Sequence, residues 1–327
     1  MAKRMQSSPE RGSDRLRVGV IGVGYLGRFH ARIYSKMSSV DLVGVADIDP
    51  RAAEEIAGEC ACQAYTDPNA FLDSADAVSI VVPTSAHAEV ARPYLEKGVH
   101  VLIEKPIASD YGESLELVEL AERQGVIFQV GHLERFNAGV MLLAEKCRNP
   151  RFIEVHRLGT FVARATDVDV VTDLMIHDID IVLSLVQSKI KHIAAAGVPV
   201  LTRHADIGNA RIEFENGAVA NVTASRVSVK KLRRMRVFGD KHYFALNYID
   251  QQLEVMRAES EGEGAEMPRV VSESLTITPH PPLDAELAHF VASVRNGTPP
   301  LVDGRVGLEA LRVALLVKER MTSCPVQ

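Results

Sequence analysis

Two patterns of apolar and polar positions divide the chain. Between Leu16 and about Gly131, short and nearly continuous apolar runs alternate with stretches in which apolar residues recur at helical spacing. The apolar runs are LRVGVIG, DLVGVAD, AVSIVVP, HVLIEKP and VIFQVGH. A strand that is apolar on both faces must be covered on both, as in a parallel sheet between two layers of helices. The pattern therefore predicts an α/β domain with a doubly wound parallel sheet over residues 15–131.

After about Gly131 the pattern changes to longer predicted strands separated by turns. Helical periodicity over 137–147 leads into the strand-like segment FIEVHRLGTFVA, and a second helix is predicted over about 172–185. Asn216-Gly217 stands between ARIEF and VANVTA, which is a strong signal for a hairpin with a two-residue loop. Two further helices are predicted to close the chain. Residues 132–327 are therefore predicted to form an α+β domain with a mostly antiparallel sheet.

Composition and charge limit the cellular compartment and the classes of partner that we expect for this protein. The chain has 327 residues, enough for two domains, and a net charge of −6 at pH 7. That charge argues against nucleic acid or an anionic membrane as the main partner, because both require a basic face. Residues 1–14 are polar and charged, without the apolar stretch of a secretory signal, and are predicted to be a disordered tail. The four cysteines form no disulfide or zinc pattern, which favours the cytoplasm.

A glycine-rich motif follows the first apolar run. The residues Gly22-Val23-Gly24-Tyr25-Leu26-Gly27 give G-x-G-x-x-G between a predicted strand and a predicted helix. In this context Gly22 permits a tight turn, Gly24 lets the backbone approach a pyrophosphate, and Gly27 lets the helix pack close to the sheet. The free N–H groups at the helix N-terminus attract the phosphate. The side chains of Tyr25 and Leu26 are expected to pack against the cofactor.

Asp47 sets the expected choice of dinucleotide. It lies twenty residues past Gly27, where a carboxylate accepts hydrogen bonds from the adenosine ribose. A 2′-phosphate at that point would place like charges in contact, so NAD is predicted in preference to NADP. Arg51 lies close enough in the sequence to weaken this preference without reversing it. The alternative interpretation of the motif is a tight strand-to-helix turn that binds no ligand.

Four motifs occur together in one order along the chain. They are the glycine motif, Pro83-Thr84-Ser85-Ala86-His87, HVLIEKP over 100–106 and DLMIHDID over 173–180. With these motifs the chain resembles the Gfo/Idh/MocA family of oxidoreductases from about residue 15 onward. The resemblance implies a Rossmann domain followed by an α+β domain with an open sheet. It also implies a tightly held nicotinamide cofactor and a homodimer or homotetramer.

Two longer segments carry a narrower resemblance. GHLERFNAGV and TDVDVVTDLMIHDIDIV resemble the subgroup that oxidises the 3-hydroxyl of UDP-N-acetylglucosamine. The subgroup implies NAD-dependent oxidation of a sugar secondary hydroxyl to a ketone, with a downstream aminotransferase as partner in lipid A biosynthesis. Alternatives within the family are an inositol or free-sugar dehydrogenase and an NAD-dependent glycosidase. A regulator that binds NAD without turnover is an alternative from another class.

The resemblance also implies the catalytic residues. Lys105 of the E-K-P motif would orient and polarise the carbinol oxygen, and His177 would accept the hydroxyl proton. Asp173 would hold the imidazole or bind a neighbouring sugar hydroxyl. Asp173, His177 and Asp180 fall at i, i+4 and i+7, so one helix face is predicted to carry all three. A metal site made of these three side chains is the alternative, but the family uses none there and no metal is predicted.

Further candidates surround these residues. The resemblance implies that Thr84, His87 and Glu104 line the nicotinamide ribose region, and Pro83 and Lys105 are expected to bind the cofactor as well. The candidate substrate contacts are His132, Arg135, Asn137 and Arg164, with ordinary surface charge as the alternative for the last three. A local basic run could contact a nucleotide-sugar diphosphate, although a charged, exposed strand edge is the favoured interpretation. This run consists of Lys230, Lys231, Arg233, Arg234 and Arg236.

Overall fold

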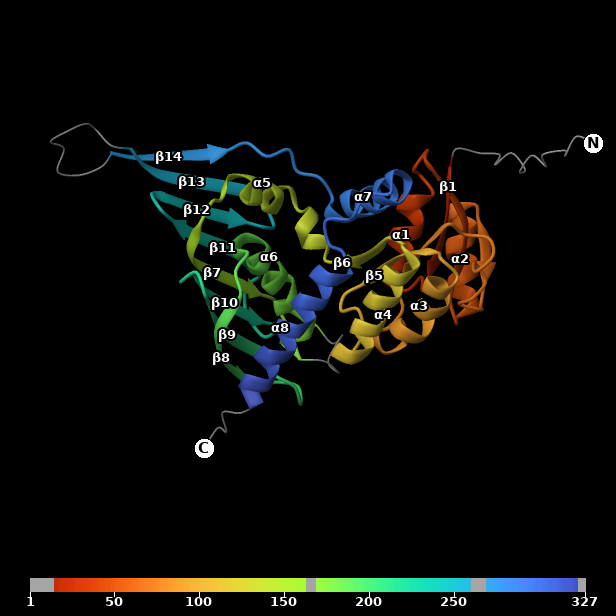
Figure 1. Ribbon diagram of the computed structural model, residues 1–327, viewed down its shortest axis with the longest axis horizontal. Coiled ribbons are helices and arrows are strands. Elements are labelled where there is room, and N and C mark those ends of the chain that lie inside the picture. The colour runs from red at the N-terminus through yellow and green to blue at the C-terminus, as the bar shows by residue number, and fades with distance from the viewer. Residues whose placement is uncertain (1–14, 163–168, 260–268, 323–327) are drawn as a thin grey trace, which may run out of the picture.

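The computed structural model describes residues 15–162, 169–259 and 269–322. The tail predicted over residues 1–14 and the candidate contact Arg164 lie outside the described residues. Two sheets stand at opposite ends of the molecule, with helices between and around them (Figure 1). No helix in the described ranges is both long enough and apolar enough to span a bilayer.

The first sheet is fully parallel, as the continuous apolar runs predict. Its strand order is β3-β2-β1-β4-β5-β6, which is the doubly wound arrangement. The strands are β1 (Leu16–Ile21), β2 (Val40–Ala46), β3 (Gln63–Tyr65), β4 (Ala77–Ile80), β5 (His100–Glu104) and β6 (Phe128–Gly131). The intervening helices are α1 (Gly27–Tyr34), α2 (Pro50–Cys60), α3 (His87–Glu96) and α4 (Tyr111–Gln124). The prediction of a Rossmann sheet is confirmed, and β3 is a short edge strand that the apolar pattern did not indicate.

Local sequence explains where these helices begin and end. Asp49 accepts a hydrogen bond from the Arg51 N–H at the start of α2, and Asp110 does the same for Glu113 at the start of α4. Helix α4 ends at Gly125, whose φ of 64° is a left-handed conformation that glycine adopts without strain. Because all six strands are parallel, their carboxyl ends meet at one edge of the sheet.

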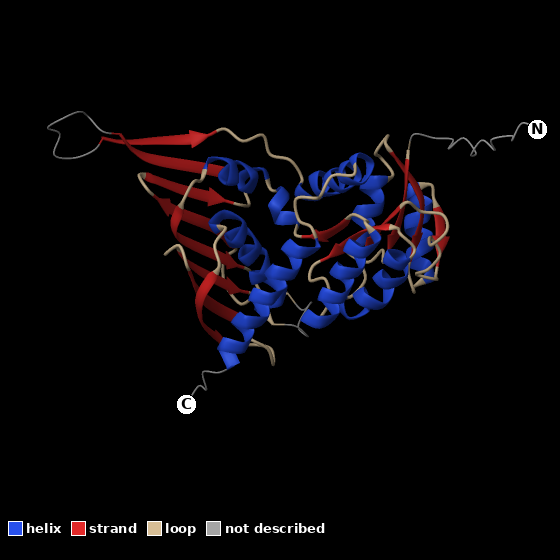
Figure 2. Cartoon of the chain, viewed as in Figure 1, coloured by secondary structure: helices blue, strands red, loops and turns tan. Residues whose placement is uncertain are grey.

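The second sheet is mostly antiparallel and open. Its order is β14-β13-β12-β11-β7-β10-β9-β8, and only the β7–β10 pair is parallel among its seven pairings. The strands are β7 (Pro150–Leu158), β8 (Ile190–Val198), β9 (Ile207–Phe214), β10 (Val219–Ser225), β11 (Leu232–Gly239), β12 (His242–Asn247), β13 (Gln252–Glu259) and β14 (Arg269–Leu275). Figure 2 shows helices gathered on one face of this sheet, toward the first sheet. They are α5 (Ala138–Lys146), α6 (Ile176–Val186) and α8 (Gly304–Thr322).

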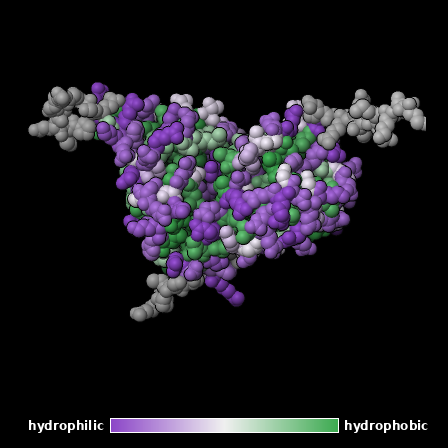
Figure 3. All heavy atoms as spheres, viewed as in Figure 1, coloured by the Kyte–Doolittle hydropathy of each residue, from purple (hydrophilic) through white to green (hydrophobic). Residues whose placement is uncertain are grey.

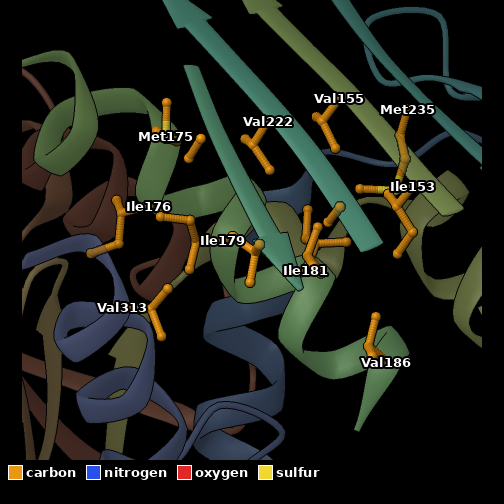
Figure 4. Close-up of a cluster of buried hydrophobic side chains, with 14 of the residues drawn as sticks. Ile153, Val155, Met175, Ile176, Ile179, Ile181, Val186, Val222, Met235 and Val313 are labelled. Atoms are coloured by element: carbon orange, nitrogen blue, oxygen red, sulfur yellow. The ribbon is translucent and has the colours of Figure 1, made fainter. Parts of the chain in front are cut away.

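A continuous apolar core holds α6 against the second sheet. Ile153 and Val155 of β7 and Met235 of β11 are fully buried beneath Ile179 and Ile181 of the helix (Figure 4). Burying side chains of this size contributes about 1.5–3 kcal/mol each, so the position of α6 is strongly fixed. The residues that precede and begin this helix therefore have a rigid support.

Helix α7 (Pro282–Asn296) follows the second sheet in the chain but packs on the first. Its Leu287 and Phe290 are fully buried in one cluster with Val18 and Val20 of β1. A segment from the C-terminal part thus completes the core of the N-terminal sheet.

Two details differ from the sequence predictions. The Asn216-Gly217 hairpin is confirmed, but its loop has three residues, because Phe214 and Ala218 form the last hydrogen-bonded pair and Gly217 has a φ of +81°. The basic run was interpreted as a strand edge, and that is wrong: β11 lies between β12 and β7 inside the sheet.

Candidate active site

The glycine motif forms the turn from β1 to α1. Gly22 has a φ of +86°, and a Cβ on it would lie 2.6 Å from the Val81 carbonyl oxygen. A Cβ on Gly27 would lie 1.8 Å from the Gly22 oxygen. A Cβ on Gly24 would meet nothing within 4 Å. The protein fold therefore requires two of the glycines, whereas the open space above Gly24 fits the approach of a ligand.

A cavity of about 420 Å³ opens beside this turn, bordered by Gly22, Gly24, Asp47 and Pro83. The Asp47 carboxylate is held at the cavity by the Val23 N–H at 2.8 Å and the Asp49 N–H at 2.9 Å. Tyr25 is 72% exposed, and its ring packs edge-on against Phe29. The turn, the carboxylate and the apolar wall are the elements that a dinucleotide requires.

Replacing Gly24 with alanine is expected to weaken NAD binding about 10- to 100-fold, because the methyl group would enter the space that a pyrophosphate fills. Titration calorimetry with NAD measures this loss. The thermal midpoint of the cofactor-free protein should not change, since the added Cβ meets no protein atom. Gly27→Ala is the matched control and should lose stability instead. Equal NAD affinity of native protein and the Gly24→Ala variant would contradict the assignment.

The ends of β4 and β5 bring the remaining predicted cofactor residues together. Glu104 ends β5, is 7% exposed and lies against Gly131, where a Cβ would be 2.8 Å from its carboxylate. Thr84 begins a short turn and is half-buried. The buried ring of His87 contacts the carbonyl oxygens of Val82 and Pro106 at 3.0 and 2.9 Å. Its ring thus ties together the segments that follow β4 and β5.

Lys105 connects the two parts of the molecule. It follows β5, and its Nζ donates a hydrogen bond of 2.7 Å to the backbone oxygen of Asp173, beside α6. The same Nζ lies 3.9 Å from the Asp173 carboxylate, and the lysine side chain is 17% exposed. Burial lowers the pKa of Lys105, the charge of Arg157 adds to this, and Asp173 and Glu104 oppose it. A buried lysine with a lowered pKa is suited to donate a hydrogen bond to a polar atom of a ligand beside Asp173.

Two buried histidines lie next to this lysine. His132 follows β6 and is 1% exposed, and its ring meets that of His177 edge-on with centroids 6.0 Å apart. Both ring nitrogens of His132 and the Nδ1 of His177 lack a hydrogen-bond partner within the described residues. Burial lowers the pKa of His132 to about 3, and the charge of Lys105 contributes. Burial and the charge of Lys105 lower the pKa of His177 well below its usual range, so both rings are neutral at neutral pH.

The predicted helix face is only partly correct. Asp173 lies in a π-helical turn (Val171–Met175) that precedes α6, so a regular i, i+4 relation to His177 does not apply. Asp180 is 1% exposed and pairs with Arg135 at 3.2 Å, and burial raises its pKa to about 7 despite that arginine. In the described part of the chain no three His, Cys, Asp or Glu side chains are placed to hold a metal ion.

The other described candidates for substrate contact, Arg135 and Asn137, have partners within the protein. Arg135 is engaged with Asp180. Asn137 caps α5 by accepting from the Gly139 N–H, and its amide donates to the Tyr248 oxygen. Among the described candidates, His132 is the one whose buried ring nitrogens both lack a hydrogen-bond partner.

A buried ion cluster beneath the site was missed by the sequence prediction. Arg157 of β7, 3% exposed, donates to both oxygens of Asp178 at 2.6 and 2.8 Å and to Glu134 at 2.8 Å. Asp178 follows His177 directly in α6. The signal was present in β7, because Ile153, Val155 and Arg157 alternate on the inward face. An arginine in that series predicts a buried charge with a partner.

Replacing His132 with glutamine is expected to make the stability less sensitive to acid. In the unfolded chain, His132 binds a proton below its usual pKa of 6.5. In the folded protein, the same ring stays neutral until the pH falls to about 3. The stability from the neutral ring is thus present above pH 6.5 and declines as the pH falls, by about 1.4 kcal/mol per unit. Urea unfolding from neutral to mildly acidic pH should give a shallower decline for the variant. His242→Gln, at the exposed first residue of β12, is the control. Parallel curves for native protein and the His132 variant would contradict this.

Comparisons with known proteins agree with this geometry. Residues 16–132 match a family described as an oxidoreductase family with an NAD-binding Rossmann fold, and residues 146–245 match the GFO/IDH/MocA C-terminal domain. The chain is 37% identical over 304 residues to UDP-N-acetylglucosamine 3-dehydrogenase from Acidithiobacillus ferrooxidans, covering 93% of this chain and 96% of that protein. A solved structure of that enzyme superimposes with a TM-score of 0.89 at 36% identity, over 94% of this chain and 98% of the other. The scyllo-inositol 2-dehydrogenase of Bacillus subtilis is 28% identical, covering 90% of this chain and 92% of that enzyme.

Proposed function

The chain belongs to the Gfo/Idh/MocA family of NAD-binding oxidoreductases, and from this premise we propose that it oxidises the 3-hydroxyl of UDP-N-acetylglucosamine to a ketone. The observation that carries the proposal is the convergence of Lys105 with His132 and His177 across the two parts of the molecule. Buried ring nitrogens without partners need an explanation, and a bound hydroxylated ligand supplies one. Figure 3 shows the outline of the molecule indented between these parts.

Each residue of the site has a separate role in the proposed oxidation. When bound, the nicotinamide accepts the hydride. Lys105 donates a hydrogen bond to the carbinol oxygen and holds the hydroxyl against His177, whose neutral ring accepts the proton. Burial, together with the cations beside His177, makes it a weak base, and an anionic substrate would offset the cations and strengthen it. Asp173 fixes the lysine through its backbone oxygen.

NAD is proposed as the cofactor in preference to NADP. Asp47 stands at the cavity with its carboxylate held by two backbone N–H groups, in position to accept from ribose hydroxyls. A 2′-phosphate would bring a second negative charge to this carboxylate. Comparing the dissociation constants of both dinucleotides with the native protein tests this. Tighter binding of NADP would contradict it.

The remaining predictions extend this proposal. The division of the chain at about residue 131, a homodimer or homotetramer formed through the open sheet, a cytoplasmic location and a downstream aminotransferase of lipid A biosynthesis are proposed with it. A regulator without turnover is disfavoured because Lys105, Asp173 and His177 are all present and together. An inositol dehydrogenase is the second candidate, favoured by the relative from Bacillus subtilis.

The decisive experiment follows NADH formation by the purified protein with NAD and a panel of UDP-sugars, free sugars and inositols. An aminotransferase or a ketone trap is included, so that an unfavourable equilibrium does not hide the reaction. Turnover of UDP-N-acetylglucosamine above the rest of the panel supports the proposal. Turnover confined to inositols supports the second candidate, and no turnover with any compound contradicts both.

A further inference from the structure

One residue of the basic run, Arg233, lies on the sheet face that the helices cover. Along β11, Arg233 and Met235 point to the face that the helices cover, and Met235 is fully buried in the core there. Leu232 and Arg234 point to the opposite face, where they border a shallow pocket with Asn247 of β12. Arg233 and Arg234 are therefore neighbours in the chain with opposite orientations.

Arg233 occupies an electrostatically costly position. It lies directly across from Arg157 of β7 in the antiparallel pairing, and like charges placed opposite each other destabilise a sheet. Both guanidinium groups depend on one acceptor, since Arg157 and Arg233 contact the same Oε1 of Glu134 at 2.8 and 3.2 Å. Arg157 has Asp178 as a second partner, whereas Glu134 is the one ion-pair partner of Arg233 within the described residues.

Arg233 is partly exposed and lies near the catalytic residues through its partner Glu134. Its side chain is 47% exposed, although that of Arg157 is only 4% exposed. Its partner Glu134 lies in the short helical turn that begins directly after His132. Its charge acts on His177, whose pKa it helps to lower. The guanidinium is therefore half exposed near His177 and has N–H donors that Glu134 does not use.

We propose that Arg233 is the specificity-determining residue that binds the diphosphate of a nucleotide-sugar substrate. A planar guanidinium matches phosphate oxygens in a bidentate way, and the negative diphosphate offsets the repulsion between Arg233 and Arg157. An inositol or a free sugar offers no such charge. The inference rests on the proposed function, because it names how the same site recognises a nucleotide sugar.

The test compares Arg233→Ala with Arg234→Ala, which removes the same group from the opposite face of the strand. With UDP-N-acetylglucosamine, KM is expected to rise about 10- to 100-fold in Arg233→Ala, as for a lost hydrogen bond to a charged group. The KM for NAD should stay unchanged, and the Arg234→Ala variant should resemble native protein. Inhibition by UDP should weaken in Arg233→Ala by a similar factor. Arg233→Lys, which keeps the charge but not the planar fork, should fall between the two.

The outcomes separate this inference from the proposed function. If native protein oxidises UDP-N-acetylglucosamine and the KM of Arg233→Ala is native, the inference is overturned while the function stands. If native protein binds UDP but oxidises another UDP-sugar, the inference is tested with that sugar and the choice of substrate is corrected. If native protein turns over only inositols or free sugars and does not bind UDP, both are overturned. Should Arg233→Ala fail to fold, the Arg233→Lys variant decides by the same readouts.

Discussion

Replacing Lys105 with methionine is expected to lower kcat by about two to four orders of magnitude, the range for losing a group that assists proton transfer. The methionine keeps most of the side-chain volume but cannot donate to the carbinol oxygen or to Asp173. The affinity for NAD should stay close to native, because the cavity beside the glycine turn and Asp47 is not bordered by this lysine. Steady-state kinetics and calorimetry with NAD measure the two effects separately.

The control for this variant is Lys97→Met, which removes an exposed lysine that pairs with Asp73 far from the cleft. It should leave both kcat and NAD affinity unchanged. A native kcat in Lys105→Met would remove this lysine from the mechanism. Loss of NAD affinity equal to the loss of turnover would instead show that Lys105 serves cofactor binding.

Replacing Arg157 with methionine is expected to lower the free energy of unfolding by about 3–5 kcal/mol, the usual result of breaking a buried ion pair from one side. The substitution leaves the carboxylate of Asp178, fully buried, without its two guanidinium hydrogen bonds. Glu134 keeps only Arg233. Because Asp178 adjoins His177, catalysis should weaken together with stability.

Urea unfolding measures the change in Arg157→Met. Arg32→Met is the matched control, since Arg32 pairs with Glu59 at the exposed surface and its loss should cost less than about 1 kcal/mol. Adding Asp178→Asn to the Arg157 variant should recover part of the stability, because it removes the unpaired charge. A loss no larger than in the Arg32 control would show that the cluster contributes little.

The first sheet could be predicted from the sequence because its strands are buried on both faces. Continuous apolar runs such as AVSIVVP mark such strands directly. Strand β3 could not be predicted in this way, because all three of its residues, Gln63–Tyr65, are exposed and give no apolar run. The length of the hairpin loop at Asn216-Gly217 could not be predicted either, because it depends on which residues form the last hydrogen-bonded pair.

The candidate site could be predicted only in part. Lys105 and His177 stand in motifs that carry a family resemblance. The ion cluster of Glu134, Arg157 and Asp178 is assembled from three separate elements, so no local pattern joins its members. The ring contacts of His87 could not be predicted either, because they depend on how the ends of β4 and β5 approach each other. Contacts across elements are decided by tertiary packing, which periodicity does not encode.

The position of α7 bears on how the chain is synthesised. The first sheet and its own helices are translated well before the segment that supplies Leu287 and Phe290, yet these side chains share a core with Val18 and Val20. While the ribosome is still adding the second sheet, that apolar surface has no covering helix. A nascent chain with such a surface is exposed to chaperones and to aggregation until the C-terminal helices emerge. Full-length translation is therefore a condition for a finished nucleotide-binding half.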